Sequence, residues 1–241
     1  MNILEFCKKD FWLTNCLSFD CYSLEEIDSD ADFCEIQEPS IFISAKVESS
    51  DNALAETLQA HGFVEINTQV TMVKTIKALN YDENKYQDSA VKTGSTIRKI
   101  SSLSNAEHFA TLFRYDRFNE DIRLPRAWSA KIKLNWILDG NDSRHKKFIV
   151  AEDSGAPVGF ILYCGIEIVQ IELVAVASSH RGFGIADTML SELERIARLE
   201  GVKELAVGTQ STNTASIRAY TRAGFVNTSS KRVFHYFRSE V

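Results

Sequence analysis

The segment from Val169 to Gly201 constrains the fold of this chain more than any other. It starts as an apolar, β-branched run, which predicts a mostly buried strand. A turn with two glycines follows at residues 181–186, and from Ile185 apolar residues recur at helical spacing. The first backbone N–H groups of a helix have no internal partners, and glycines let an anion approach them closely. The segment therefore predicts a phosphate-binding strand, turn and helix, with Arg181 adding a positive charge at its rim.

Two common phosphate loops are excluded by the residues of this turn. It has no Gly-Lys-Ser/Thr, as a nucleoside-triphosphate loop would, and its glycine spacing differs from that of a dinucleotide fingerprint. It does match the Arg-x-x-Gly-x-Ala loop of the GCN5-related N-acetyltransferases (GNATs), which cradles the diphosphate of coenzyme A. Residues 171–176 resemble the fourth strand of that superfamily. The alternative is an ordinary strand–helix turn that binds no phosphate, and only motifs elsewhere in the chain can distinguish the two.

Composition limits the class of protein and its partners. The net charge of −6 argues against nucleic acid, because neutralising phosphates needs a basic face. No apolar run is long enough to span a bilayer, and the first residues do not read as a signal peptide. The five cysteines are odd in number and form no Cys-x-x-Cys pair, which favours reduced thiols in the cytoplasm and no zinc site. We expect a soluble cytoplasmic protein without a metal; whether it forms a homodimer is left open.

The pattern of apolar residues predicts two domains. Residues 1–77 contain a strand–helix–strand unit at 41–47, 51–61 and 63–76, and form a smaller N-terminal α/β domain. The polar, aperiodic residues 78–95 are predicted to be the linker, and residues 96–241 the catalytic domain. The second part predicts the order β-α-α-β-β-β-α-β-α-β. Its first half consists of strand 96–101, helix 104–114 with a Ser104/Glu107 capping box at its start, helix 126–138 and the hairpin strands 147–152 and 158–165. The strand and helix of the Val169–Gly201 segment come next, followed by strand 203–210, helix 213–223 and one or two strands in 225–238.

A second motif makes the resemblance to the GNATs specific. Asn-x-x-Ser-x-x-x-Tyr-x-x-x-Gly-Phe at residues 213–225 resembles the second signature of that superfamily, with Ser216 where alanine is usual. On both motifs and the element order, the chain is identified as a member of the GNAT superfamily. The resemblance implies an α/β (α+β) fold with a mixed, mostly antiparallel sheet, splayed central strands and flanking helices. It also implies acetyl-CoA or another acyl-CoA as co-substrate.

The resemblance further implies the residues of the coenzyme A site. The expected set is Val174, Val176, Arg181, Gly182, Phe183, Gly184, Ile185, Ala186, Asn213, Ser216 and Tyr220. Backbone amides near Val174 or Val176 would polarise the thioester carbonyl. Tyr220 would be the general acid that protonates the leaving thiolate; the alternative is that it packs against pantetheine. Asn213 would contact the cofactor, cap its helix, or both.

The base that would deprotonate the amine is the least determined residue. Glu172 lies in the opening strand, where some relatives keep a catalytic glutamate, but a solvated surface carboxylate is an equal alternative. His180 adjoins the loop, yet a surface role fits it better. A sugar amine can also lose its proton to a chain of waters, so no dedicated base is required.

A closer resemblance, to the dTDP-fucosamine acetyltransferases, covers most of the chain. It rests on residues 58–63, on the Arg-Phe-x-x-Asp element at residues 117–121, on the tryptophan at 136, on residues 209–213 and on the aromatic end at residues 236–238. It implies that the acceptor is a nucleotide-linked, dTDP-type amino sugar for cell-surface polysaccharide synthesis. Arg117, Phe118 and Asp121 would then bind it, with a structural salt bridge as the alternative.

Two other functions stay open. A protein, peptide or small-amine N-acetyltransferase would use the same cofactor loop with another acceptor, and a non-catalytic acyl-CoA-binding module would keep the loop without turnover. The acyl group could be acetyl or longer, such as 3-hydroxybutyryl.

Overall fold

The protein is described by a computed structural model, which covers residues 3–25, 36, 38–77 and 95–239. Its described strands form one ten-stranded sheet in the order β1-β2-β3-β10-β4-β9-β8-β7-β6-β5. The strands are β1 (Cys7–Lys9), β2 (Cys21–Leu24), β3 (Ile41–Glu48), β4 (Val64–Thr75), β5 (Thr96–Ile100), β6 (Lys146–Asp153), β7 (Ala156–Cys164), β8 (Ile168–Val176), β9 (Glu204–Gln210) and β10 (Val226–Arg238). The helices are η1 (Ile3–Phe6), α1 (Phe11–Leu17), α2 (Asn52–Ala60), α3 (Ala106–Ala110), α4 (Arg117–Glu120), α5 (Ala127–Asp142), η3 (Ser178–His180), α6 (Ile185–Leu199) and α7 (Thr214–Arg222). A mixed, mostly antiparallel sheet with flanking helices confirms the predicted fold class.

The predicted strand–helix–strand unit near the N-terminus is present as β3, α2 and β4. The Asp51 carboxylate starts α2 by accepting a hydrogen bond of 3.0 Å from the Leu54 amide. On the face that α2 covers, Ala55 and Leu58 pack into a core with Phe63 and Phe234. The elements before β3 were not predicted, because η1, β1 and β2 are three or four residues long and α1 has only seven, too few for a clear periodic signal.

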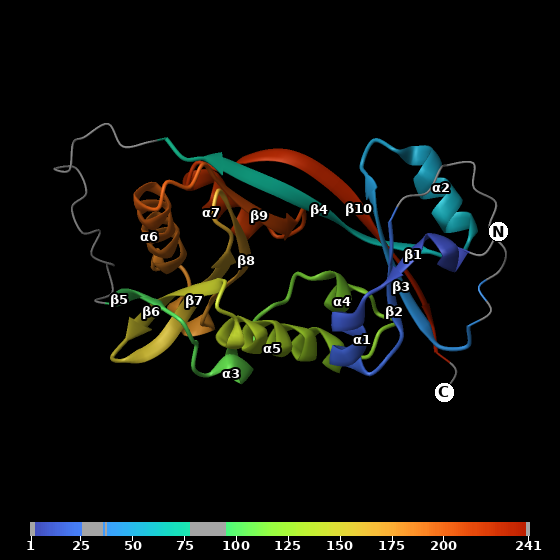
Figure 1. Cartoon of the computed structure of the whole chain (residues 1–241), viewed down its shortest axis with the longest axis horizontal. Helices are drawn as coiled ribbons and strands as arrows, with labels where there is room; N and C mark the ends of the chain where they lie inside the picture. Colours follow the sequence, from blue (N-terminus) through green and yellow to red (C-terminus); the bar gives the residue numbers. More distant parts are fainter. Residues whose placement is uncertain (1–2, 26–35, 37, 78–94, 240–241) are drawn as a thin grey trace.

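Strands β4 and β10 join the two halves of the molecule. β4 pairs antiparallel with β9 through residues 69–75 and with β10 through residues 64–73, so it lies between two strands of the C-terminal part. In Figure 1 both strands run from the neighbourhood of α6 and α7 to the part that holds α2 and β3. The N-terminal residues therefore complete the sheet. The division into two domains stays a prediction, and residues 78–94 of its linker lie outside the described residues.

The two faces of the sheet carry different cores. The apolar side of α6, with Ile185, Met189 and Leu193, packs on one face, and α3 and α5 cover the other around Phe109, Phe148 and Phe160. The hairpin between β6 and β7 turns at Ser154 and Gly155, both with positive φ, as its sequence predicted.

The helix predicted over residues 104–114 is shorter than expected. α3 spans five residues, and its N-cap is Asn105 in the left-handed conformation, with no hydrogen bond from its side chain in the described structure. The Ser104/Glu107 capping box is therefore absent from this part of the chain. The residues that follow α3 lead into α4, a four-residue helix that the sequence pattern did not predict.

Candidate active site

The centre of the sheet opens where β8 and β9 separate. The two strands pair in parallel over residues 168–171 of β8 and 204–207 of β9. Beyond that point β8 continues along β7 to Val176, whereas β9 continues along β4 to Gln210. The strands thus diverge after Ile171 and Val207, which confirms the predicted splay.

A β-bulge at Glu172 sets the direction of the backbone beside the gap. Leu162 pairs with Leu173 and Tyr163 with Ile171, so Glu172 has no partner on β7. Farther along, the Ala177 amide donates to the Val158 carbonyl at 2.8 Å. Because amides alternate in direction along a strand, those of Val174 and Val176 point away from β7, toward the gap.

Two cavities meet at this gap. The larger, of about 360 Å³, extends toward β3, β4, α4 and α5, and the smaller, of about 250 Å³, extends toward the turn before α6. Both are lined by Phe113, Tyr115, Val174, Asn213, Ser216 and Tyr220. A molecule in one cavity would therefore reach a molecule in the other beside Val174 and Tyr220.

The turn at the smaller cavity has the features that a diphosphate needs. Gly182 and Gly184 have φ of +84° and +82°, and a Cβ at either would meet no described atom within 4 Å. Gly184 is the N-cap of α6, so the free amides of the first turn open beside Ala186, which lines the cavity. The Nε of Arg181 donates to the Val176 carbonyl at 3.0 Å, holding the guanidinium at the cavity wall. Of the other predicted residues, Phe183 is exposed and Ile185 is buried in the core, so Ile185 can contribute only its backbone.

The residues of the second motif lie on α7. Asn213 caps the helix by accepting from the Ser216 amide at 3.2 Å, and its Nδ2 donates to Thr209 Oγ1 at 3.3 Å. Tyr220 comes two turns later on the same face and is 5% exposed. Burial raises the pKa of its phenol above the ordinary value, so the hydroxyl keeps its proton at every physiological pH.

A comparison with known families agrees with this geometry. The model of the acetyltransferase (GNAT) family matches residues 107–225, which include the splayed strands, the turn and the second motif. Residues 107–225, close to half of the chain, thus belong to the GNAT superfamily of acetyltransferases. Members of this superfamily transfer acetyl groups from acetyl-CoA to amines. Among proteins with curated functions, none matches the sequence.

Solved structures share the fold at low sequence identity. A GCN5-related N-acetyltransferase from Sphaerobacter thermophilus is 18% identical, with a TM-score of 0.54 over 86% of this chain and 63% of that chain. A conserved protein of unknown function from Staphylococcus epidermidis is 19% identical, with a TM-score of 0.56 over 82% of this chain and 73% of that one. This chain spans less than two thirds of the Sphaerobacter protein. The resemblance to the dTDP-fucosamine acetyltransferases is not confirmed by these comparisons.

Glu172, the predicted base, lines the larger cavity, but three partners hold its carboxylate. Its carboxylate accepts from Trp136 Nε1 at 2.9 Å, pairs with Lys146 at 2.8 Å and accepts from the Cys164 thiol at 3.3 Å. His180 is turned toward Asp153, with its Nε2 3.2 Å from the carboxylate, and is outside the described linings of both cavities. Glu172 as a base stays a prediction, although its partners favour a positioning role.

The α4 segment brings Arg117 and Phe118 to the larger cavity. Asp116 caps α4 by accepting from the amides of Phe118 at 3.0 Å and Asn119 at 3.2 Å, and it accepts from Ser129 Oγ at 2.6 Å. At the other end Glu120 accepts from Asn67 Nδ2 of β4. The Arg117 guanidinium lies over the Phe118 ring, 4.7 Å from its centroid.

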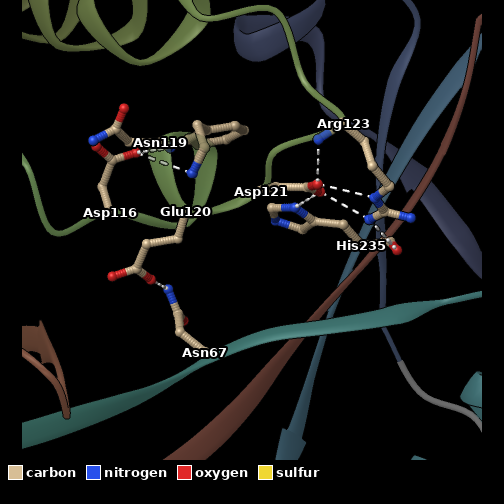
Figure 2. A network of polar contacts seen from close by, with 8 residues as sticks. Asn67, Asp116, Asn119, Glu120, Asp121, Arg123 and His235 are labelled. Atoms are coloured by element: carbon tan, nitrogen blue, oxygen red, sulfur yellow. Dashed lines mark hydrogen bonds and ion pairs between the residues drawn. The ribbon is translucent and has the colours of Figure 1, made fainter.

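Asp121, the third predicted acceptor residue, lies outside the described lining of either cavity. Its carboxylate accepts from Arg123 at 2.8 and 2.9 Å and contacts His235 Nδ1 at 3.0 Å (Figure 2). Burial raises the pKa of Asp121, but these hydrogen bonds outweigh that effect and hold the pKa below its ordinary range. These contacts anchor the loop after α4 to β10 and fit the structural alternative, while acceptor binding by Asp121 stays a prediction.

The acceptor side also contains residues that the motifs did not indicate. Lys46 of β3, Gln69 of β4 and Lys133 of α5 line the larger cavity. Lys133 had a sequence signal, since it falls on the stripe of α5 that includes the buried Ser129 and Ile137. Lys46 had none, because it is an exposed position near the end of a mostly buried strand, where a lysine is ordinarily solvated.

Three further findings concern the residues that the structure describes. They include no cluster of three His, Cys, Asp or Glu side chains that could hold a metal ion. None of the helices within the described ranges has the length and apolar character needed to cross a bilayer. Cys7, Cys16, Cys21 and Cys164 are unpaired, and Cys34 lies outside the described residues.

Proposed function

We propose that this chain transfers an acyl group from acyl-CoA to the amino group of a small acceptor bound in the larger cavity. The observation that carries the proposal is the meeting of two cavities at the divergence of β8 and β9. One cavity ends at a glycine turn suited to a diphosphate, and the other is lined by polar and charged side chains. An arrangement of this kind brings donor and acceptor into contact while each keeps its own entrance.

The turn and its helix would hold the coenzyme. The glycines leave room for phosphate oxygens at the amides of residues 182–186, and Arg181 adds a charge beside them. Bound acyl-CoA would supply a thioester. The pantetheine arm would run between Val174 and α7, where Asn213 and Ser216 line both cavities.

Two groups of the chain are suited to the charge that develops during transfer. The Val174 amide, directed into the gap by the bulge at Glu172, can donate to the carbonyl oxygen of the thioester. Tyr220 can hold a proton at its Oη for the leaving thiolate, because burial keeps the phenol protonated.

The acceptor amine needs to lose a proton as well. The two carboxylates that line the larger cavity, Asp116 and Glu172, are both hydrogen-bonded within the protein. We therefore expect the amine to lose its proton to water in the open cavity, with Glu172 holding Trp136 in place.

A nucleotide-linked, dTDP-type amino sugar, as used in cell-surface polysaccharide synthesis, is the acceptor to test first. The position of Arg117 in the larger cavity supports an acceptor that carries phosphate. The test is a coenzyme-A-release assay with acetyl-CoA and 3-hydroxybutyryl-CoA against dTDP-amino sugars, free amino sugars and peptides. Release with an amino sugar supports the proposal; release with peptides alone would redirect it to peptide acetylation, and no release with any amine would contradict it.

A further inference from the structure

Three cationic side chains line the larger cavity from three separate elements. They are Lys46 on β3, Arg117 at the start of α4 and Lys133 on α5. Lys133 is 8% exposed, although it carries a charge. None of the three has a hydrogen bond or an ion pair within 4.0 Å to a residue that the structure describes.

The positive charges of this cluster are close enough to oppose one another. Burial lowers the pKa of Lys133, and the charge of Arg117 lowers it further, while Asp116 opposes the shift. Desolvation lowers the pKa of Lys46 to about 8, with Arg117 and Lys231 adding to the effect. Bringing like charges together in a cleft is unfavourable unless an anion joins them.

The nearby carboxylates offset this positive charge only in part. Asp10 and Asp116 favour the charged form of Arg117, and Asp116 favours that of Lys133, but no described carboxylate forms an ion pair with any of the three cations. Asp116 is occupied by two backbone amides and by Ser129 Oγ. Glu172 is paired with Lys146 and bonded to Trp136 Nε1. Lys133 has aromatic neighbours, its Nζ lying 5.4 Å from the Phe113 ring centroid and 5.1 Å from that of Trp136, but these rings carry no charge.

The cluster is held in place by contacts outside the cavity. Asp116 and Glu120 fix the two ends of α4, and the Asp121, Arg123 and His235 contacts tie the loop after it to β10 (Figure 2). Arg117 therefore stays at the cavity wall, over the Phe118 ring and without an ion pair to a described residue. Preorganised cations of this kind are suited to an oxyanion.

We propose that Lys46, Arg117 and Lys133 bind an oxyanion of the acceptor, so that the substrate is an amine that also carries a phosphate or a carboxylate. The inference rests on the proposed function, because it takes the larger cavity as the acceptor site. It also gives the N-terminal part of the chain, through Lys46, a direct role in substrate recognition.

The direct test is calorimetric binding of anions to the full chain saturated with coenzyme A, which blocks the diphosphate site beside α6. The probes are inorganic pyrophosphate for the phosphate class and succinate for the carboxylate class. We expect one of them to bind, and Lys133→Met and Arg117→Gln each to weaken it about tenfold or more, because a charge-assisted contact is lost. Lys203→Met, which removes an exposed lysine paired with Glu167, is the control and should change nothing.

The outcomes separate this inference from the proposed function. Binding of pyrophosphate would identify the oxyanion of the acceptor as a phosphate, and binding of succinate would identify it as a carboxylate. Failure of both probes to bind, or unchanged affinity in both cavity variants, overturns the inference. If coenzyme A is released as fast with an amino sugar that lacks phosphate and carboxylate as with its nucleotide-linked form, the acyltransferase proposal is supported and the oxyanion site is contradicted. If a probe binds as expected but no amine supports release, the site stands and the acyltransferase proposal falls.

Discussion

At the scale of single residues, the glycine turn gives a sharp prediction for coenzyme binding. Gly184→Val places a branched side chain where a phosphate would lie, so acyl-CoA affinity should fall at least about tenfold. The substitution also strains the backbone, because φ is +82°. Gly201→Val is the matched control, since Gly201 has φ of +71° and equally open surroundings beyond the C-terminal end of α6, the opposite end of that helix from the coenzyme turn. Isothermal titration of both variants should show loss in the first alone; equal loss, or none, would move the site elsewhere.

The buried pair of Asp121 and His235 predicts how stability depends on pH. Burial lowers the pKa of His235 to about 4, and the hydrogen bond to Asp121 only partly offsets this effect. In the unfolded chain the imidazole binds a proton below about pH 6.5, whereas in the folded chain it does so only below about 4, so acid favours unfolding. The contribution lost between pH 7 and pH 4 is about 3 kcal/mol.

Urea unfolding at a series of pH values measures this effect. The free energy of unfolding of wild type should fall more steeply from pH 7 to pH 4 than that of His235→Asn, which keeps a donor for Asp121 but does not titrate. His145→Asn changes an exposed histidine and should behave as wild type. Parallel curves for wild type and His235→Asn would mean that His235 is not buried as a neutral ring.

Part of the candidate site could be predicted from the sequence. Whether a residue could be predicted depends on whether its signal is local in the chain or arises only in the folded structure. The turn before α6 and the residues of α7 each form a continuous segment, so the spacing of their residues was enough to indicate a coenzyme A site. Lys46 and Lys133 meet only because β3 and α5 converge on one cavity, and no local pattern encodes that distance. Asp121, predicted to bind the acceptor, contacts His235 more than a hundred positions away in sequence, and no local pattern indicates that contact.

At the scale of elements, Gly140 determines how closely α5 packs on the sheet. A Cβ at this position would lie 2.8 Å from Phe148 Cζ and 3.0 Å from Leu162 Cδ1. Gly140→Ala should therefore destabilise the protein by about 1–3 kcal/mol, although alanine is the better helix former by about 1 kcal/mol. Chemical denaturation of Gly140→Ala, of Phe148→Leu and of the double variant measures the change in the free energy of unfolding. The double variant should lose less than the sum of the singles, because the smaller side chain removes the clash. A stabilising single substitution would contradict this packing.

Most elements were predictable because their signals are local. The β6–β7 hairpin, the cap of α2 and the amphipathic α6 each follow from residues close in sequence. The failures have two causes. The capping box before α3 did not form because Asn105 takes the left-handed conformation there, and the short elements before β3 depend on packing with distant strands.

At the scale of the whole molecule, the shared sheet predicts how the two parts behave when the chain is cut. A specific protease site placed within residues 78–94 would leave the two pieces joined by the pairing of β4 with β9 and β10. We expect the cut protein to elute as one complex by size exclusion with light scattering, and to keep its affinity for acyl-CoA. Separation into two folded pieces would instead support the independent domains predicted from the sequence.

The most direct test of the whole account is a single-turnover measurement of acyl transfer. Enzyme in excess over acetyl-CoA is mixed with an amine acceptor found by the release assay, and the N-acetylated product is quantified over time. We predict product formation by wild type and a rate about 10²–10⁴-fold lower for Tyr220→Phe, with acyl-CoA affinity retained, because the proton at Oη is gone. Tyr163→Phe is the control, since that buried hydroxyl has no partner among the described residues and lies outside the described linings of both cavities. Bound acetyl-CoA that stays intact with every acceptor would contradict the account, and an unchanged rate in Tyr220→Phe would remove Tyr220 as the acid.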